Sequence, residues 1–440
     1  MNAPELSSYR PRHLAKAVVE ALEDTPVVCI LGPRQCGKST LARQCDPKRA
    51  YLSLDQREYF ELARNDPEGF IDQLPEQVAI DEIQRVPELT LAIKRSVDAK
   101  RLPGRFLLTG SANLLQLPRL ADSLVGRMEC VYLQPFTESE KEGSAGRFIE
   151  AWMAGELSTT LPPSSAPAPS DLPDRLVAGG FPDACFRTSR RARRWQAEYV
   201  AAIIERDVRD IADVQDATDL SRLLEFTANQ TANLLNVSAT ANALGHTRRT
   251  IEKHLGILEK LFLVRQLPAW HSNRNKRLVK TPKIHICDSG LCAMVANLQA
   301  GQWNEERSRF GHLLKSFVVQ QMIALSAGLD HPPRFYHYRD KPSPPSRNGL
   351  RDHPPRFYHY RDKDQVEVDL VMETGSKVWG IKVKAAANLK SSDGKGLRRL
   401  AESAEDRFQG GIIFYAGEAI LPINRQLKLY AVPISKLWEL

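Results

Sequence analysis

The first third of the chain alternates short apolar runs with stretches of helical periodicity. The apolar runs cover residues 27–31, 51–54, 78–80, 105–109 and 131–133. Runs of this length, separated by helical patterns, are typical of parallel strands joined by crossover helices. The pattern predicts an α/β domain over residues 1–138, with a parallel sheet and helices on both of its faces.

Helical periodicity dominates the middle of the chain. Ser238 is predicted to cap a short helix, Gly245 to make a turn, and Thr247 to cap a longer helix. Two strand-like pieces with a basic hairpin between them follow, at 263–267 and 283–287. Helix, turn, helix and hairpin together predict a winged helix within a helical domain that covers residues 176–296.

The segment between these two domains, residues 139–175, is rich in Pro, Ser and Ala and predicts an exposed linker. Residues 297–440 predict a third, C-terminal α/β domain, with a helix near 311–324 followed by strands at 366–372 and 378–383.

One sequence in this last domain occurs twice. Residues 330–341 are repeated without change at 352–363. Two strands of one sheet are seldom identical, so we expect one copy in the sheet and the other in a loop. The second copy runs directly into the strand at Val366, so the pattern favours a 22-residue insert at 330–351.

Composition narrows the class of protein. The 440 residues carry a formal net charge of +8 and a pI of about 9.1, which is compatible with nucleic acid as a partner and also with a solvated basic surface. The seven cysteines form no C-x-x-C pair, as expected of reduced thiols. No run approaches a membrane span, and residues 1–12 lack the apolar core of a signal peptide. These features predict a cytoplasmic protein with no membrane partner.

A phosphate-binding loop follows the first apolar run. It reads Gly32-Pro33-Arg34-Gln35-Cys36-Gly37-Lys38-Ser39-Thr40. Its glycines let the backbone N–H groups and a helix N-terminus face the β-phosphate of a nucleotide. Lys38 then bridges the β- and γ-phosphates, and the Ser39 hydroxyl is a ligand for Mg²⁺. Cys36 lies beside Lys38 and a helix N-terminus, which would favour its thiolate. Its backbone does the binding, however, so its thiol is expected to be a bystander.

An acidic strand end supports this interpretation. The apolar run at 78–80 ends in Asp81 and Glu82. Asp81 is predicted to hold Mg²⁺, and Glu82 to orient or deprotonate the attacking water. Either motif alone is compatible with a buried strand capped by solvated acids. The two motifs together predict a site for ATP and Mg²⁺.

With these pieces in order, the chain resembles a prokaryotic family of AAA-type P-loop ATPases that carry a C-terminal domain of unknown function. Besides the loop, the matching segments are 81–87, 108–111, 124–127, 179–182, 205–208, 280–283 and 288–291. The resemblance implies an ATPase core, a winged-helix middle and a C-terminal part similar to restriction endonucleases.

The resemblance also implies roles for single residues. Thr109 and Ser111 would end the strand beside the Asp81 strand and sense the γ-phosphate. Arg127 or Arg206 would act as an arginine finger, in its own subunit or in a neighbouring subunit of a homo-oligomer. An ordinary turn for the first pair and surface ion pairs for the arginines remain the alternatives.

Two further sets of residues could meet nucleic acid. The winged helix would bring cations to phosphates and base edges from its second helix and its hairpin tip, namely Arg248, Arg249, Lys253, Arg274, Lys276 and Arg277. Winged helices also serve as lids and as protein-docking modules, so this partner stays open.

The nuclease-like part departs from the pattern that its resemblance implies. Asp369 and Lys384 fit an acid and an acid-x-Lys on neighbouring strands, but Lys382 and Lys315 stand where carboxylates are needed. Two extra cations would repel a divalent metal. We therefore expect a degenerate nuclease fold without cleavage activity, in which Lys382 faces Asp369 and Lys384. This domain could still present positive charge to the phosphate backbone of a nucleic acid.

The sequence thus favours a Mg-dependent ATPase that acts as a switch or motor coupled to its winged-helix and C-terminal domains. The alternative is a DNA-binding regulator or defence component, in which nucleotide controls assembly and turnover is negligible.

Overall fold

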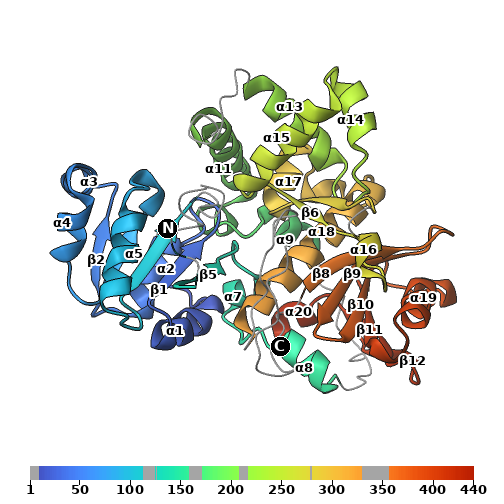
Figure 1. Cartoon of the computed structure of the whole chain (residues 1–440). Coiled ribbons are helices and arrows are strands. Elements are labelled where there is room, and N and C mark those ends of the chain that lie inside the picture. Colours follow the sequence, from blue (N-terminus) through green and yellow to red (C-terminus); the bar gives the residue numbers. More distant parts are fainter. Residues whose placement is uncertain are drawn as a thin grey trace, which may run out of the picture. The chain divides into compact units, whose positions relative to one another are not determined.

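The computed structural model describes residues 9–111, 124, 126–157, 171–207, 217–277, 280–329 and 356–440. The chain forms two compact units (Figure 1). The first contains Met1–Phe148 together with Ala327–Asp330 and Leu437–Leu440, and the second contains Ile149–Ser326 and His331–Lys436.

The first unit contains a five-stranded sheet in the order β2-β3-β4-β1-β5. Every adjacent pair is parallel, which confirms the sheet expected from the alternating pattern. The strands are β1 (Val27–Leu31), β2 (Ala50–Ser53), β3 (Val78–Asp81), β4 (Phe106–Gly110) and β5 (Met128–Tyr132). All residues of β1 and β4 are buried, as in strands covered on both faces.

Helices connect these strands. They are α1 (Leu14–Asp24), α2 (Lys38–Cys45), α3 (Arg57–Asn65), α4 (Pro67–Asp72), the 3₁₀ turn η1 (Ile83–Arg85), α5 (Leu89–Ala99) and α7 (Glu138–Glu142). Helix α1 buries Leu14, Ala17, Val18 and Ala21, at the spacing of one helix face, in the same core as strand β1.

Part of the expected linker is folded. Thr137 and Glu140 form a capping box at the start of α7, and helix α8 (Phe148–Ala154) buries Phe148 and Trp152. The linker prediction is therefore wrong for residues 139–157, because local capping and an apolar helix face outweigh the Pro and Ser content farther along. Residues 158–170 lie outside the described part of the chain.

The first part of the second unit is helical, as the periodicity predicts. Its helices are α9 (Leu172–Ala178), α10 (Pro182–Cys185), α11 (Ser189–Ala202), α13 (Ala217–Asn229), α14 (Val237–Leu244), α15 (Arg248–Lys260), α16 (Arg274–Arg277), α17 (Ser289–Val295) and α18 (Arg307–Leu325). A π-helical turn, η3 (Ile203–Asp207), continues α11, and two 3₁₀ turns, η4 (Ala300–Gln302) and η5 (Ser326–Gly328), flank α18.

The turn between α14 and α15 lies where the sequence predicts it. Gly245 ends α14 with a φ of 73°, and the Thr247 hydroxyl accepts a hydrogen bond from the Thr250 N–H at 3.1 Å. Asn236, rather than Ser238, caps α14. The two following strands, β6 (Val264–Leu267) and β7 (Lys283–Ile286), pair antiparallel.

The last part of the unit holds a mixed six-stranded sheet in the order β12-β13-β11-β10-β9-β8. Its strands are β8 (Arg356–Arg361), β9 (Glu367–Thr374), β10 (Lys377–Val383), β11 (Phe408–Tyr415), β12 (Leu421–Asn424) and β13 (Leu429–Pro433). Between β10 and β11 the chain forms η6 (Ser391–Gly394), α19 (Lys395–Ala404) and η7 (Glu405–Arg407), and α20 (Lys436–Glu439) follows β13.

The β6–β7 hairpin is joined to this sheet. The Trp270 N–H donates to the His359 carbonyl at 2.6 Å, and the His359 N–H donates to the Pro268 carbonyl at 2.9 Å. The segment after β6 therefore pairs with β8 through Ala269 and His359. The boundary expected at residues 296–297 does not separate two compact units.

The second copy of the repeated sequence supplies β8, whereas the first copy lies outside the described residues. In β8, the Tyr360 ring is buried 6.1 Å from that of Trp270, and its hydroxyl lies 2.9 Å from Ser403 Oγ.

We expect Tyr360→Ala to lower the free energy of unfolding by about 3 kcal/mol. The identical Tyr338 is the matched control, and Tyr338→Ala should leave urea unfolding unchanged. Equal losses in the two variants would contradict this assignment.

Candidate nucleotide-binding site

The predicted phosphate-binding loop joins β1 to α2. Gly37 has a φ of 99°, which side chains disfavour. At Gly32, a Cβ atom would lie 2.2 Å from the Leu133 carbonyl oxygen, so only glycine fits. Burial raises the pKa of the Cys36 thiol, and this effect outweighs the nearby charges of Lys38 and Arg12. The raised pKa disfavours a thiolate and is compatible with a bystander role for this side chain.

Lys38 lies inside this loop. Its side chain is 4% exposed, and Nζ donates to the carbonyl oxygens of Gly32 at 3.1 Å and of Pro33 at 2.7 Å. The loop thus holds a buried ammonium group in its centre, where a nucleotide phosphate could replace the two carbonyl oxygens as its partner.

Ser39 meets Asp81 across the sheet. Ser39 Oγ lies 2.9 and 3.1 Å from the two carboxylate oxygens of Asp81, which is 5% exposed. Hydroxyl and carboxylate oxygens are the ligands that Mg²⁺ prefers, so this pair fits the metal that the sequence predicts. Burial, together with Asp81, raises the pKa of the neighbouring Tyr51 to about 12.

The strand order brings Thr109 to the same place. Strand β4 lies between β1 and β3, so its carboxyl end lies between the loop and Asp81. The Thr109 hydroxyl donates to Asp81 and accepts a hydrogen bond from the Glu82 N–H at 3.1 Å. Glu82 has a φ of 59°, in the left-handed region that few non-glycine residues adopt.

Two polar side chains hold the Glu82 carboxylate. Ser111 Oγ donates to Glu82 Oε2 at 3.2 Å, and Gln84 Nε2 donates both to Glu82 and, at 2.9 Å, to Ser111 Oγ. Gln84 is not among the site residues that the sequence predicts. Its position two residues after Glu82 was the available signal, because η1 turns the chain back toward the strand end.

The structure separates Arg127 from this site. Strand β5 runs parallel to β1 with Met128 opposite Val27, so Arg127 lies where the strands begin. The loop starts at the other end of β1, roughly 15 Å away at the usual rise per strand residue. Arg127 also pairs with Asp98 at 2.5 Å. Within one chain, Arg127 is therefore out of reach of a phosphate at the loop, and its role in a neighbouring subunit stays a prediction. The Arg206 side chain lies outside the described part of the structure.

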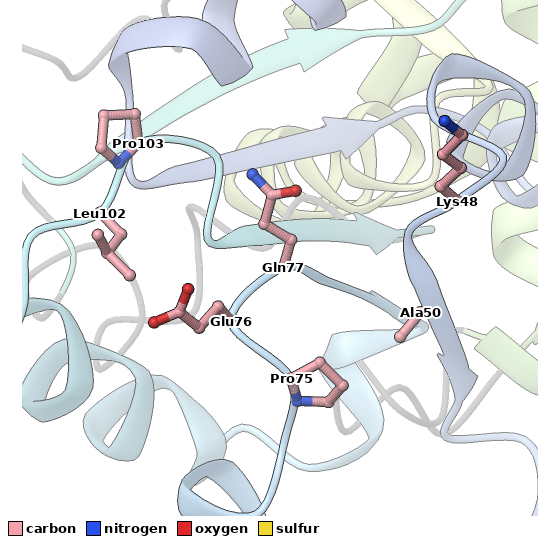
Figure 2. Close-up of a pocket in the computed structure, with 7 residues that line it drawn as sticks. All are labelled: Lys48, Ala50, Pro75, Glu76, Gln77, Leu102 and Pro103. Carbon is pink, nitrogen blue, oxygen red and sulfur yellow. The ribbon is translucent and has the colours of Figure 1, made fainter.

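A pocket of about 520 Å³ opens where the strands of the parallel sheet begin, at the end opposite the phosphate-binding loop (Figure 2). Its lining includes Lys48, Glu76 and Gln77, which precede β2 and β3. Ligands of open parallel sheets bind at the carboxyl ends of the strands, so the pocket is not the expected nucleotide site.

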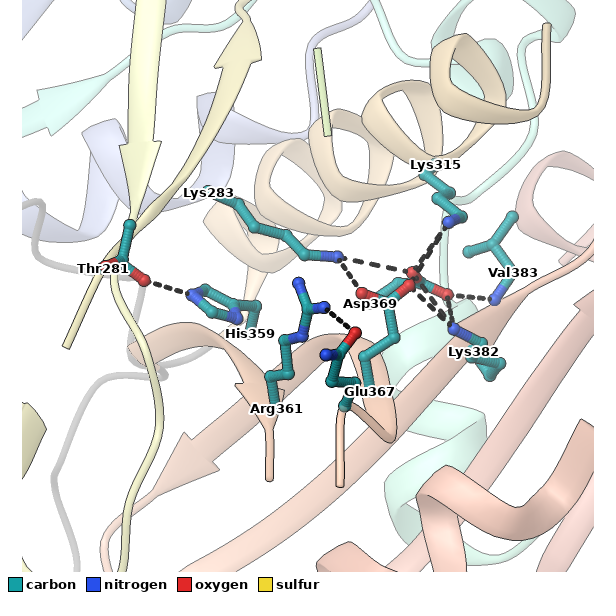
Figure 3. Close-up of polar contacts among 10 residues, drawn as sticks. Thr281, Lys283, Lys315, His359, Arg361, Glu367, Asp369, Lys382 and Val383 are labelled. Atoms are coloured by element: carbon teal, nitrogen blue, oxygen red, sulfur yellow. Dashed lines mark hydrogen bonds and ion pairs between the residues drawn. The ribbon is translucent and has the colours of Figure 1, made fainter. Parts of the chain in front are cut away.

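A second cluster of charged residues gathers where α18 and β7 meet the C-terminal sheet (Figure 3). Asp369 is 1% exposed, and its carboxylate lies 3.2 Å from Lys382 Nζ, 3.5 Å from Lys315 Nζ and 3.7 Å from Lys283 Nζ. Glu367, two residues earlier on the same strand face, lies 3.2 to 3.4 Å from the same three ammonium groups. Three cations and two carboxylates leave one net positive charge. We call these five residues the lysine cluster.

The charges in this cluster perturb one another. Burial opposes ionisation of Glu367 and Asp369, but the three lysines together lower the pKa of Glu367 to about 2 and hold that of Asp369 well below its usual range. Burial, aided by Lys283, lowers the pKa of His359 to about 4. Both carboxylates are therefore ionised and this histidine is neutral near pH 7.

The lysine cluster differs from the expected set in two ways. Lys382 faces Asp369, as alternation along β10 predicts, but Lys384 follows the end of the strand and pairs with Asp393 at 2.7 Å. Lys283 and Glu367 were missed. Glu367 follows from its spacing to Asp369, whereas Lys283 comes from the β6–β7 hairpin, far away in the sequence.

The cations predicted to meet nucleic acid have different surroundings. Arg248, Arg249 and Lys253 are exposed on α15, and Arg248 pairs with Glu252 at 2.8 Å. Lys276 is also exposed, and nothing is described of the Arg274 side chain.

Arg277 does not belong to the set of exposed cations that could meet nucleic acid. It is 8% exposed, pairs with Glu373 at 2.5 Å and stacks over the Tyr358 ring at 4.9 Å. The aromatic and acidic partners in the C-terminal sheet draw this arginine inward, away from a hairpin tip.

The parallel sheet, the glycine-bearing loop and the Ser39–Asp81 contact define a P-loop nucleotide-binding domain. Residues 24–141 match a family model described as an AAA domain, so the chain carries an AAA-type P-loop ATPase domain. Residues 169–302 and 346–437 match two domains of unknown function, DUF8612 and DUF4143. These matches confirm the part of the resemblance that concerns an AAA-type domain followed by domains of unknown function, whereas its winged-helix and nuclease-like parts stay predictions.

Two similar proteins are uncharacterized proteins of Mycobacterium bovis and Mycobacterium tuberculosis. Each is 27% identical over 374 residues, which cover 85% of this chain and 73% of the relative. A solved Walker-type ATPase of Pyrococcus abyssi is 17% identical with a TM-score of 0.39, covering 66% of this chain and 99% of its own. AMPPCP-bound DnaA from Aquifex aeolicus is 16% identical with a TM-score of 0.25, covering 56% of this chain and 86% of its own. Within the described residues, no helix is both long and apolar enough to cross a membrane.

Proposed function

We propose that the protein binds Mg·ATP at the Gly32–Thr40 loop and hydrolyses it. The observation that carries this proposal is the 2.9 Å contact between Ser39 Oγ and Asp81, which joins the two motifs at one point. Lys38 binds the β- and γ-phosphates, Ser39 and Asp81 hold Mg²⁺, and Thr109 connects Asp81 to the backbone of Glu82. When bound, Mg²⁺ supplies charge neutralisation at the phosphates.

Glu82 orients or deprotonates the attacking water in this proposal. Its carboxylate is held by Ser111 and Gln84, so a γ-phosphate that binds Ser111 would also change the partners of Glu82. This link supports a sensing role for Thr109 and Ser111. It also supports the use of hydrolysis as a switch, because the state of the nucleotide changes contacts at the strand ends.

The output of this switch would pass to the second unit. Helices α14 and α15 with the β6–β7 hairpin have the parts of a winged helix, and the exposed Arg248, Arg249 and Lys253 favour phosphate contacts there. The lysine cluster supports a degenerate nuclease fold, because its ammonium groups surround the carboxylates that would otherwise bind a metal. A DNA-binding regulator with negligible turnover is the second candidate, favoured by the exposed cations of α15.

Turnover distinguishes the two candidates. The full chain should release phosphate from Mg·ATP at a rate that depends on Mg²⁺, measured without additive and with duplex DNA, single-stranded DNA and RNA. Stimulation by one nucleic acid, lost in an Arg248→Ala/Arg249→Ala/Lys253→Ala variant, would support a DNA-coupled ATPase. ATP binding without measurable release under any condition would favour the regulator.

A further inference from the structure

Arg12 lies beside the phosphate-binding loop, outside every motif described above. It precedes α1, and its side chain is 5% exposed. The guanidinium donates from Nη1 to the Cys36 carbonyl at 2.8 Å, from Nη2 to the Gln134 carbonyl at 2.5 Å, and from Nε to Glu140 at 3.1 Å. Its Cζ atom also lies 4.5 Å from the centre of the Phe136 ring. One side chain thus joins the loop to the segment that follows β5.

Glu140, the acidic partner of Arg12, is itself held in place by further hydrogen bonds. Glu140 Oε1 also accepts from the His13 N–H at 2.8 Å, and Glu140 belongs to the capping box of α7. A planar fork with partners on all three nitrogens has little freedom to rotate. The position of the Cys36 carbonyl is therefore set by a buried ion pair outside the loop.

The direction of this carbonyl decides where a neighbouring N–H points. In a trans peptide, the C=O of Cys36 and the N–H of Gly37 lie in one plane and point in opposite directions. Because Arg12 holds the carbonyl oxygen, the Gly37 N–H faces away from Arg12. Backbone N–H groups of such loops bind the phosphates.

We propose that Arg12 is a positioning residue for polyphosphate binding: it holds the Cys36–Gly37 peptide so that the Gly37 N–H is presented to the phosphates of the nucleotide. The inference rests on the proposed nucleotide site. It adds a residue that touches neither nucleotide nor metal and acts through the loop backbone.

The test measures affinity and stability separately in the full chain. We expect Arg12→Ala to weaken binding of Mg·ADP at least about tenfold by calorimetric titration, because a charge-assisted hydrogen bond to the loop is lost. Arg12→Lys keeps a buried cation beside Glu140 and covers the case in which the alanine variant does not fold. A single ammonium group cannot reach all three partners of Arg12. The loss of Mg·ADP affinity in Arg12→Lys should therefore be measurable but smaller than in Arg12→Ala.

Arg49 provides a matched control. It is a buried arginine of the same unit that pairs with Asp46 at 3.4 Å and donates to the Gly104 carbonyl at 2.6 Å, at the opposite edge of the sheet. Arg49→Ala should lower stability to urea and leave the Kd for Mg·ADP unchanged.

Wild-type affinity in folded Arg12→Ala and Arg12→Lys would overturn the role of Arg12, and so would an equal affinity loss in Arg49→Ala. Absence of Mg·ADP binding by the unaltered protein would instead overturn the nucleotide site itself.

Discussion

ATP turnover at least about a hundredfold below that of the unaltered protein is the result expected for Glu82→Gln, with nucleotide binding retained. The amide keeps the size of the side chain and can still bond Ser111 and Gln84, but it cannot accept a proton from water. The loss should therefore appear in kcat rather than in Kd. Phosphate release at saturating Mg·ATP, together with a titration of Mg·ADP, measures both quantities.

Two further variants serve as controls for Glu82→Gln. Glu58→Gln, on the exposed face of α3, should leave turnover unchanged. Lys38→Ala removes the buried ammonium group of the loop and should weaken ATP binding itself. Turnover at the unaltered rate in both Glu82→Gln and Lys38→Ala would rule out the ATPase assignment.

A loss of about 3 to 5 kcal/mol in the free energy of unfolding is expected for Asp369→Asn, since breaking a buried ion pair leaves charges without compensation. In this variant, three ammonium groups would share the single carboxylate of Glu367. The amide can accept hydrogen bonds but supplies no negative charge. Urea unfolding at pH 7 gives the difference directly.

Asp364→Asn is the matched control for this prediction. Asp364 is exposed and lies 3.8 Å from Arg399, so its loss should cost less than about 1 kcal/mol. Similar losses in the two variants would mean that the lysine cluster contributes no special stability. Metal-dependent DNA cleavage by the unaltered protein, abolished in Asp369→Ala, would show that the C-terminal domain is an active nuclease.

The sequence was sufficient for features that local patterns determine. Apolar runs predicted the parallel strands, and two short motifs predicted which residues meet at Ser39 and Asp81. The capping box at Thr137 was equally local and was overlooked, because composition over a long window hid it.

Other features depend on contacts between distant segments. Arg12 and Glu140 are 128 residues apart, and Lys283 reaches Asp369 from another part of the chain. Arg127 shows a different difficulty. Its place depends on which end of β5 it occupies, and only the pairing of β5 with β1 reveals that it lies opposite the loop.

The β6–β7 hairpin has a consequence for how this protein can change through evolution. The chain leaves the helical region at Val264, pairs with β8, places Lys283 in the lysine cluster and then re-enters the helices at Ser289. No single cut in the polypeptide separates the two regions without removing a strand or a charge from one of them. Although they match separate family models, we expect them to be inherited as a pair, with substitutions at Lys283 compensated at Glu367 or Asp369.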